Sequence, residues 1–252
     1  MPAHELIVLV AGAVAAGFVQ GLSGFGFSLV AMSFWAWTID PPTAAVTAVF
    51  GALTGQVVAA VTVRRGFHLA RLLPFIAGGL VGIPLGLVLL PRLDATVFRA
   101  FIGTVLALWC PAMLFAGNIP RVTVGGRVAD AAIGACGGAM GALGGATGAI
   151  PTLWCTLRGF DKDTQRAVIQ NFNLATLAVT MAGYLGSGLV TREMLMPFAI
   201  VAPAMLVPVL LGARLYIGIS EATFRRIVLG LLTASGIALL ASSVPRLVQR
   251  LG

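Results

Sequence analysis

Charged residues are scarce in this sequence. Only 10% of its 252 residues are charged, whereas 59% are hydrophobic and the mean hydropathy is +1.01. A soluble domain carries about 25% charged residues, so most of this surface is not built for water. Apolar stretches recur along the whole chain, each near the ~20 residues that a helix needs to cross the membrane. The sequence therefore predicts an all-α polytopic membrane protein with no soluble domain of any size.

Histidine and cysteine are also scarce, which argues against a metal site. Cys110, Cys136 and Cys155 all lie in apolar segments and have no metal-ligand spacing, so we predict no metal and no cofactor. The net charge of +8 comes from short loops, and no basic cluster is interleaved with exposed aromatic residues. The expected surroundings are therefore a lipid bilayer, with no nucleic-acid partner.

No acidic or basic residue lies deep in an apolar stretch. All eight acidic residues are at or near predicted segment ends: Glu5, Asp40, Asp94, Asp130, Asp161, Asp163, Glu193 and Glu221. A buried ionisable residue would be the usual mark of a proton relay or a cation site. If a charged solute crosses here, neutral groups must solvate it inside the membrane.

The apolar segments divide the chain into two similar halves. They are Glu5–Ile39, Thr43–Val63, Ala70–Leu90 and Ala95–Ala116, then Arg127–Leu157, Thr164–Leu189, Met194–Ala213 and Ala222–Val244. Shifted by 120 positions, Gly17, Gly21 and Gly24 fall on glycines, and shifted by 126, Phe98-Arg99 falls on Phe224-Arg225. We predict two membrane repeats, residues 1–118 and 119–252, in one transmembrane domain, as is common in secondary transporters.

The first segment of each half is too long for one crossing and too short for two. Glu5–Ile39 has 35 residues, about 52 Å as one straight helix, and two crossings would need ~40 residues. Glycine-rich breaks interrupt both segments, at residues 21–26 and 144–148. We therefore expect each segment to form a re-entrant hairpin of two half-length helices, with its turn covered by protein or facing a water-filled cavity.

The positions of the basic residues favour hairpins that return to the side on which they start. This arrangement puts 11 of the 16 basic residues on one side, whereas a single crossing by each interrupted segment divides them 8 to 8. The positive-inside rule expects a bias. Three crossings then remain per half, an odd number, so the repeats are predicted to be inverted. Two full crossings per interrupted segment would give the same sidedness.

The breaks supply neutral groups that suit an anion. A new helix is expected to begin near Phe27 and near Ala149, and its first N–H groups lack intrahelical partners and carry the positive end of the helix dipole. The glycines permit positive φ and a close approach of the backbone, and nearby side chains add neutral donors. The candidate substrate-binding residues are Gln20, Gly21, Ser23, Gly24, Gly26, Ser28, Gly144, Gly145, Thr147, Gly148, Thr152 and Asn171.

Other interpretations of these residues stay open. Glycine-rich membrane segments also serve as helix-packing surfaces, although two breaks in matching positions favour a binding role. Pro151 fits the first position of a new helix or a simple kink. Buried amides need partners, so Gln56 and the group Gln170, Asn171 and Asn173 either bond a hairpin tip or reach the solute.

An intramembrane serine protease is an alternative function. Gly21-Leu22-Ser23-Gly24 matches the GxSG nucleophile motif of the rhomboid proteases, but the serine needs a histidine within the membrane to activate it. His4 and His68 lie at the terminus and in a loop, so we predict that the chain is not an enzyme. An anion channel with the same site is a second alternative.

Three motifs taken together resemble those of a known family of membrane proteins. They are the run over residues 17–26, its counterpart over residues 137–148 followed by Pro151, and the late pair Phe224-Arg225. In these, the sequence resembles the sulfite exporter TauE/SafE family over nearly its whole length, although no proline follows the first run. The resemblance implies a multi-pass secondary transporter of a bacterial cell inner membrane that moves sulfite, a sulfonate or a related small organosulfur anion, commonly outward. The residues themselves decide neither the anion nor whether the chain forms a homo-oligomer.

Overall fold

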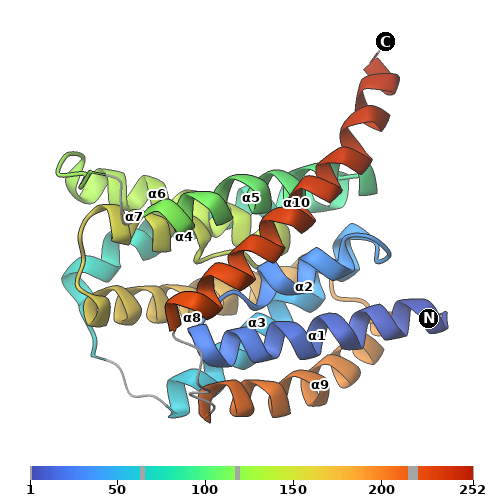
Figure 1. The fold of residues 1–252 in the computed structure, drawn as a ribbon, viewed down its shortest axis with the longest axis horizontal. Helices are drawn as coiled ribbons and strands as arrows, with labels where there is room; N and C mark the ends of the chain where they lie inside the picture. Colours follow the sequence, from blue (N-terminus) through green and yellow to red (C-terminus); the bar gives the residue numbers. More distant parts are fainter. Residues whose placement is uncertain (1, 63–65, 117–119, 215–220, 252) are drawn as a thin grey trace.

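The computed structural model describes residues 2–62, 66–116, 120–214 and 221–251, and these form helices and no strand (Figure 1). Val63, the expected end of the second segment, lies outside the described residues. The helices are α1 (Ala3–Ser23), α2 (Phe27–Trp35), α3 (Pro41–Thr62), α4 (Leu69–Leu89), α5 (Ala95–Phe115), α6 (Gly126–Gly144), α7 (Ala149–Leu157), α8 (Lys162–Gly186), α9 (Leu195–Arg214) and α10 (Glu221–Leu251). Short 3₁₀ turns, Leu90–Arg92 and Arg192–Met194, follow α4 and precede α9.

Six helices of the described residues are candidate membrane spans, which confirms the all-α polytopic fold. They are α1, α3, α4, α5, α9 and α10, and the spans of α4 and α9 include the adjoining 3₁₀ turns. α8 has 25 residues but is not among them, because it is more polar than the others. Its polar residues Gln170, Asn173, Thr176 and Thr180 are buried, and it packs against α3, α4, α6 and α7. A helix enclosed by other helices needs no apolar surface for lipid on those faces.

Each interrupted segment folds back on itself as predicted, but the two arms differ in length. The long arms α1 and α6 have 21 and 19 residues, and the short arms α2 and α7 have 9 each. At the end of α2, the indole Nε1 of Trp35 donates to the carbonyl of Leu9 at 3.2 Å, and at the end of α7, Nε1 of Trp154 donates to Oδ1 of Asp130 at 2.7 Å. The half-length prediction is therefore correct only for the short arms, since the long arms reach about 30 Å.

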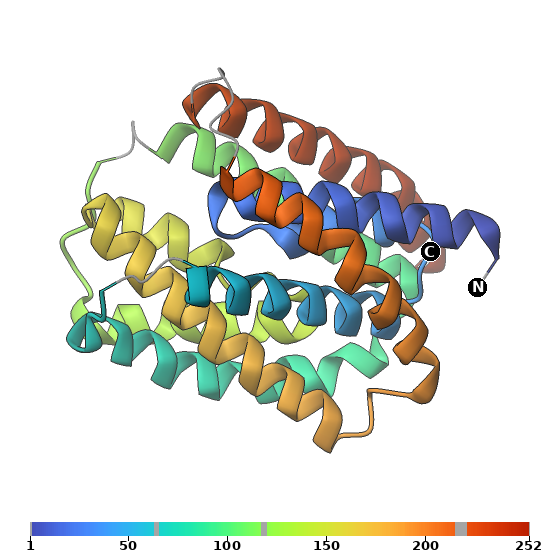
Figure 2. The same cartoon turned by 90° about the horizontal axis from the view of Figure 1, so that it is seen from below.

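Helices of the two halves interleave in matching pairs (Figures 1 and 2). α1 lies along α9 and α6 lies along α4, while α3 packs against α8 and α5 against α10. If each helix is replaced by the helix in the same position of the other half, the pair α1 and α9 becomes the pair α6 and α4. The pairs α3 with α8 and α5 with α10 stay the same. The helix pairing thus has the pattern that an internal two-fold exchange would produce. That the halves have opposite orientations in the membrane stays a prediction.

Glycines outside the breaks bring these helices into close contact. A Cβ at Gly82 of α4 would collide with the carbonyl of Ala135 on α6, and one at Gly17 of α1 would meet the carbonyl of Met205 on α9 at 2.7 Å. Small residues at such positions allow the backbones to approach. The packing interpretation is therefore correct for Gly17 and Gly82.

Candidate anion site between the hairpin tips

Glycines with positive φ form the turn of each hairpin. Gly24 and Gly26 have φ of 78° and 94° at the first break, and Gly145 has a φ of 75° at the second. Residues with a Cβ are strained in this region. By contrast, Gly21 and Gly144 are helical and close α1 and α6 rather than turning the chain.

The short helices begin where the sequence predicts, and neither has a side-chain cap. α2 begins at Phe27 and α7 at Ala149, and their N-cap positions are occupied by Gly26 and Gly148. Glycine has no side chain that can accept from the first N–H groups of a helix. The N-terminus of α2 is therefore left open to an external acceptor, whereas in α7 the N–H of Ala149 already donates to the carbonyl of Ala146 at 3.2 Å. Pro151 is the third residue of α7 rather than the first.

The first turn of α2 has more N–H groups without an intrahelical partner than the first turn of α7 has. The first intrahelical bond of α2 runs from the N–H of Val30 to the carbonyl of Gly26 at 3.1 Å, so the N–H groups of residues 27–29 precede it. In α7 the N–H of Thr152 bonds the carbonyl of Gly148 at 3.0 Å, and Pro151 before it has no N–H. α2 thus supplies more backbone donors than α7.

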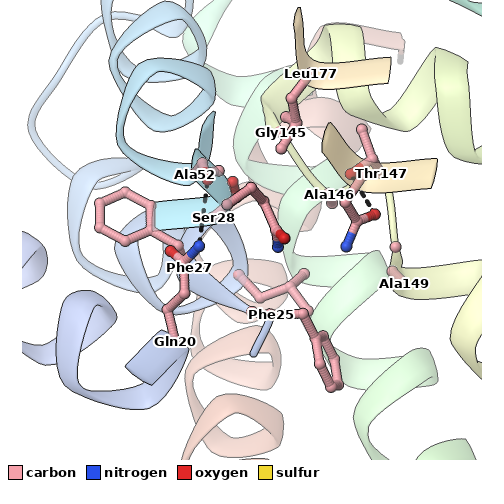
Figure 3. A pocket seen from close by; sticks show the side chains of 15 residues that line it. Gln20, Phe25, Phe27, Ser28, Ala52, Gly145, Ala146, Thr147, Ala149 and Leu177 are labelled. Carbon is pink, nitrogen blue, oxygen red and sulfur yellow. Dashed lines mark hydrogen bonds between the residues drawn. The ribbon is translucent and has the colours of Figure 1, made fainter. Parts of the chain in front are cut away.

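The two breaks meet and line one pocket (Figure 3). Ser28 in the first turn of α2 lies against Gly145, where an added Cβ would collide with its Oγ. Gln20 and Phe27 lie on one side of the pocket, with Ala146 and Thr147 on the other. The pocket lining consists of Gln20, Phe25, Gly26, Phe27, Ser28, Leu29, Ala52, Gln56, Gly145, Ala146, Thr147, Gly148, Ala149, Asn173 and Leu177. None of these residues is charged.

Half of the twelve candidate residues line this pocket. They are Gln20, Gly26, Ser28, Gly145, Thr147 and Gly148. The other six do not line it: Gly21, Ser23, Gly24, Gly144, Thr152 and Asn171.

Ser23 and Gly24 shape the first break instead. The hydroxyl of Ser23 donates to the carbonyl of Val19 at 2.7 Å and to the carbonyl of Phe25. The carbonyl of Gly24 accepts from Nε2 of Gln56 at 3.0 Å. Both residues stabilise the turn that precedes α2. They therefore affect the shape of the pocket without lining it.

The amide that reaches the pocket is Asn173 rather than Asn171. Nδ2 of Asn171 donates to the carbonyl of Ala167 at 2.9 Å, and its side chain faces an apolar surface groove. Oδ1 of Asn173 accepts from the hydroxyl of Thr147 at 2.9 Å, and its amide lies beside Gly148. Two positions along a helix differ by about 200°, so only one of the two can face the pocket. The spacing of Asn173 with Thr176 and Thr180 was the signal that could have distinguished them.

α5 contacts both hairpins through two of its side chains. Nε1 of Trp109 donates to the carbonyl of Ala149 at 2.6 Å, while its ring packs edge-on against Phe25 at 6.4 Å. Arg99 donates from Nε to the carbonyl of Ala36 and from Nη2 to that of Trp37, both at 2.8 Å, just beyond α2. This gives the Phe98-Arg99 motif a structural role, whereas the side chain of its counterpart Arg225 lies outside the described residues.

The family model for the sulfite exporter TauE/SafE matches residues 9–239, which include both breaks and the whole pocket lining. The chain belongs to this family. No curated protein and no solved structure matches the chain. TauE/SafE proteins are transporters, which fits a chain that is not an enzyme. The protease motif has no support here either, since the hydroxyl of Ser23 donates to backbone carbonyls and both His4 and His68 are exposed.

Proposed function

We propose that this TauE/SafE protein is a secondary transporter that exports a small organosulfur anion, such as sulfite or a sulfonate, bound between the two hairpin tips. The family supplies the substrate class and the direction. The observation that carries the proposal is the convergence of two uncapped helix N-termini on one pocket without charged residues. The proposal includes a multi-pass location in a bacterial inner membrane and allows a homo-oligomer.

The donors around the pocket suit an oxyanion. Backbone N–H groups at the start of α2 face it from one repeat, beside the hydroxyl of Ser28, which donates to the carbonyl of Ala48 at 3.4 Å. The amide of Asn173 faces it from the other repeat, while the hydroxyl of Thr147 donates to Oδ1 of this amide. Because Oδ1 of Asn173 accepts from Thr147, its NH₂ group is left to donate. The absence of a carboxylate among the lining residues avoids repulsion of an anion.

Transport requires the tips to separate. The pocket has a volume of about 20 Å³, roughly the space of one water molecule, whereas sulfite has four heavy atoms. Movement of one hairpin with its packed partner, α1 with α9 or α6 with α4, would widen the pocket toward one face of the membrane at a time.

Exchange of radiolabelled sulfite in proteoliposomes of the purified protein tests this function. We expect Asn173→Leu to lower the exchange rate at least tenfold, because it removes a donor and leaves the Thr147 hydroxyl without its acceptor. Asn171→Leu is the matched control, since it changes the same residue type on the same helix outside the pocket. Equal exchange by the two variants would remove this site.

The same assay separates a carrier from an anion channel. Unlabelled sulfite inside the vesicles should accelerate uptake of labelled sulfite by a carrier, because the loaded site returns faster than the empty one. Uptake that is indifferent to internal sulfite would favour the channel alternative.

A further inference from the structure

The pocket contains hydrogen-bond acceptors as well as donors. Gln20 of α1 and Gln56 of α3 both line it, with only 3% and 2% of their surface exposed. Nε2 of Gln20 donates to the carbonyl of Ala52 at 3.2 Å, and Nε2 of Gln56 donates to the carbonyl of Gly24 at 3.0 Å. These bonds fix the orientation of each amide, because exchanging its N and O would set two oxygens against each other.

The two amide oxygens have no hydrogen-bond donor within the described part of the chain. Gln20 was expected to add a donor, but its NH₂ group already donates to Ala52, and its Oε1 is the atom that lacks a hydrogen-bond partner. Near the second break the hydroxyl of Tyr184 donates to the carbonyl of Ala142 at 2.7 Å, and Thr147 donates to Asn173. The other buried side-chain atoms without a partner in the described part of the chain are hydroxyl oxygens, of Thr47, Thr152 and Thr180, which can donate as well as accept. Since buried polar groups are almost always satisfied, the surplus of acceptors at the first break indicates a missing ligand.

We propose that Oε1 of Gln20 and Oε1 of Gln56 bind a monovalent cation, Na⁺, in the same pocket as the anion. This rests on the proposed function of the same pocket. Amide and backbone carbonyl oxygens are the ligands that hard cations prefer. α1 also directs the negative end of its helix dipole toward this break, whereas α2 directs its positive end toward the anion. The break thus offers separate positions to a cation and an anion.

The ligands favour a cation of single charge whose binding depends on the anion. No group of three His, Cys, Asp or Glu that could hold a metal occurs among the described residues, so a divalent metal has no charged ligands here. With only neutral oxygens, the charge of Na⁺ is balanced by the oxyanion in the same pocket. Each ion must then raise the affinity for the other by the same factor.

Isothermal titration calorimetry of the purified full-length protein with sulfite tests the proposal, in NaCl or choline chloride at equal ionic strength. We expect sulfite to bind at least fivefold more tightly in Na⁺. Gln20→Met and Gln56→Met should each abolish this difference between the two salts. The matched control is Gln165→Met on α8, whose amide donates to Thr152 and Thr156 outside the pocket, and which should keep the full Na⁺ effect.

A gain-of-function variant guards against misfolding of the Met variants. In Gln56→Lys the ammonium group replaces the cation, so sulfite binding should become independent of Na⁺ and at least as tight as that of the wild type in Na⁺. Equal sulfite affinity of the wild type in both salts would overturn the cation site and leave the proposed function standing. No sulfite binding in either salt would overturn both.

Discussion

Single residues at the breaks determine whether the pocket exists at all. Gly145 combines a positive φ with a position directly against Ser28 of the other half of the chain, and Gly26 occupies the N-cap position of α2. The polar side chains around them are short and are held by neighbours, as Thr147 is by Asn173. The site is therefore sensitive to the addition of single atoms.

Replacing Gly145 with Ala should destabilise the protein and impair transport. The left-handed conformation costs about 1–3 kcal/mol for a residue with a Cβ, and the new methyl group collides with Oγ of Ser28. We expect a lower melting temperature in detergent and a large loss of sulfite exchange. Gly186→Ala on α8 is the control, because nothing lies within 4 Å of its Cβ position. If both variants melted at the same temperature, the strain argument would be wrong.

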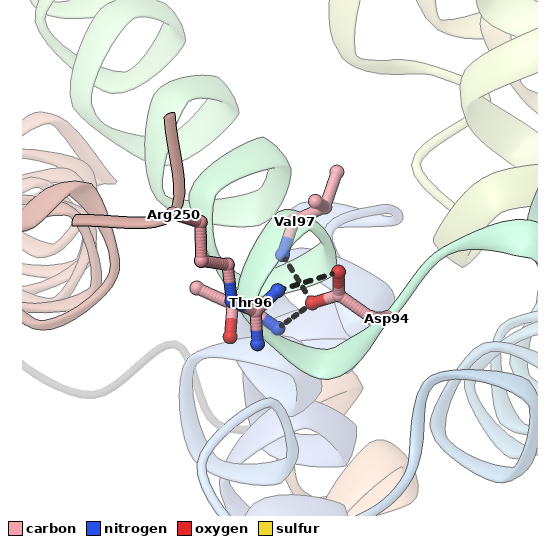
Figure 4. Close-up of polar contacts among 4 residues, drawn as sticks. All are labelled: Asp94, Thr96, Val97 and Arg250. Carbon is pink, nitrogen blue, oxygen red and sulfur yellow. Dashed lines mark hydrogen bonds and ion pairs between the residues drawn. The ribbon is translucent and has the colours of Figure 1, made fainter. Parts of the chain in front are cut away.

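At the scale of the helices, polar contacts at the ends keep long and short elements in place. Asp94 precedes α5 and accepts from the N–H groups of Thr96 at 2.7 Å and of Val97 at 3.1 Å, and Arg250 of α10 pairs with it at 3.0 Å (Figure 4). This contact joins the start of α5 to the end of α10, the two helices that pack along each other.

The stabilising effect of Asp94 should depend on pH. The backbone N–H groups of Val97 and Thr96 lower the pKa of its carboxyl below the usual 3.8. Because the folded-state pKa is depressed, the contribution is complete above the unfolded-state pKa and is lost as the pH falls through the folded-state value. Asp94→Ala should therefore lower the melting temperature at pH 7, with a difference from wild type that shrinks below pH 3.8.

Asp94→Asn provides the control for this cap. Asparagine caps helices about as well as aspartate, so this variant should melt closer to the wild type at pH 7 than the alanine variant does. A difference between Asp94→Ala and wild type that stayed constant from neutral to strongly acidic pH would contradict the assignment.

On the scale of the whole molecule, helices of one half pack closely against helices of the other. α4 of the first half and α6 of the second are joined at glycines, and so are α1 and α9. The long arm of each hairpin thus packs against a helix of the other half. The pocket lies where the two hairpin tips meet.

Adding a side chain at one of these glycines should loosen the join between the halves. A valine at Gly82 meets the carbonyl of Ala135, so α4 and α6 must move apart. Overpacking of this kind costs about 1–3 kcal/mol, which should appear as a lower melting temperature in detergent. Gly230→Val on α10 is the control, since its Cβ would meet nothing within 4 Å. Equal melting of the two variants would show that this contact is not tight.

The inverted orientation of the halves predicts the sidedness of two exposed positions. With hairpins that return to their starting side, Gly66 before α4 and Ser187 after α8 lie on opposite faces of the membrane. Single cysteines placed there, with the exposed Cys136 replaced by Ser, should react with an impermeant maleimide from opposite sides of membrane vesicles. Labelling of both from the same side would mean that each interrupted segment crosses once.

Local sequence patterns determined the membrane environment, the helical class, the two breaks and the starts of α2 and α7. These depend on runs of apolar residues and on glycines, whose effects act over a few residues. The selection of Asn173 over Asn171, the unequal hairpin arms and the unpaired oxygens of Gln20 and Gln56 were decided by tertiary structure. Which face of a helix is enclosed, and which polar atom finds a partner, depends on backbones brought together from distant parts of the chain.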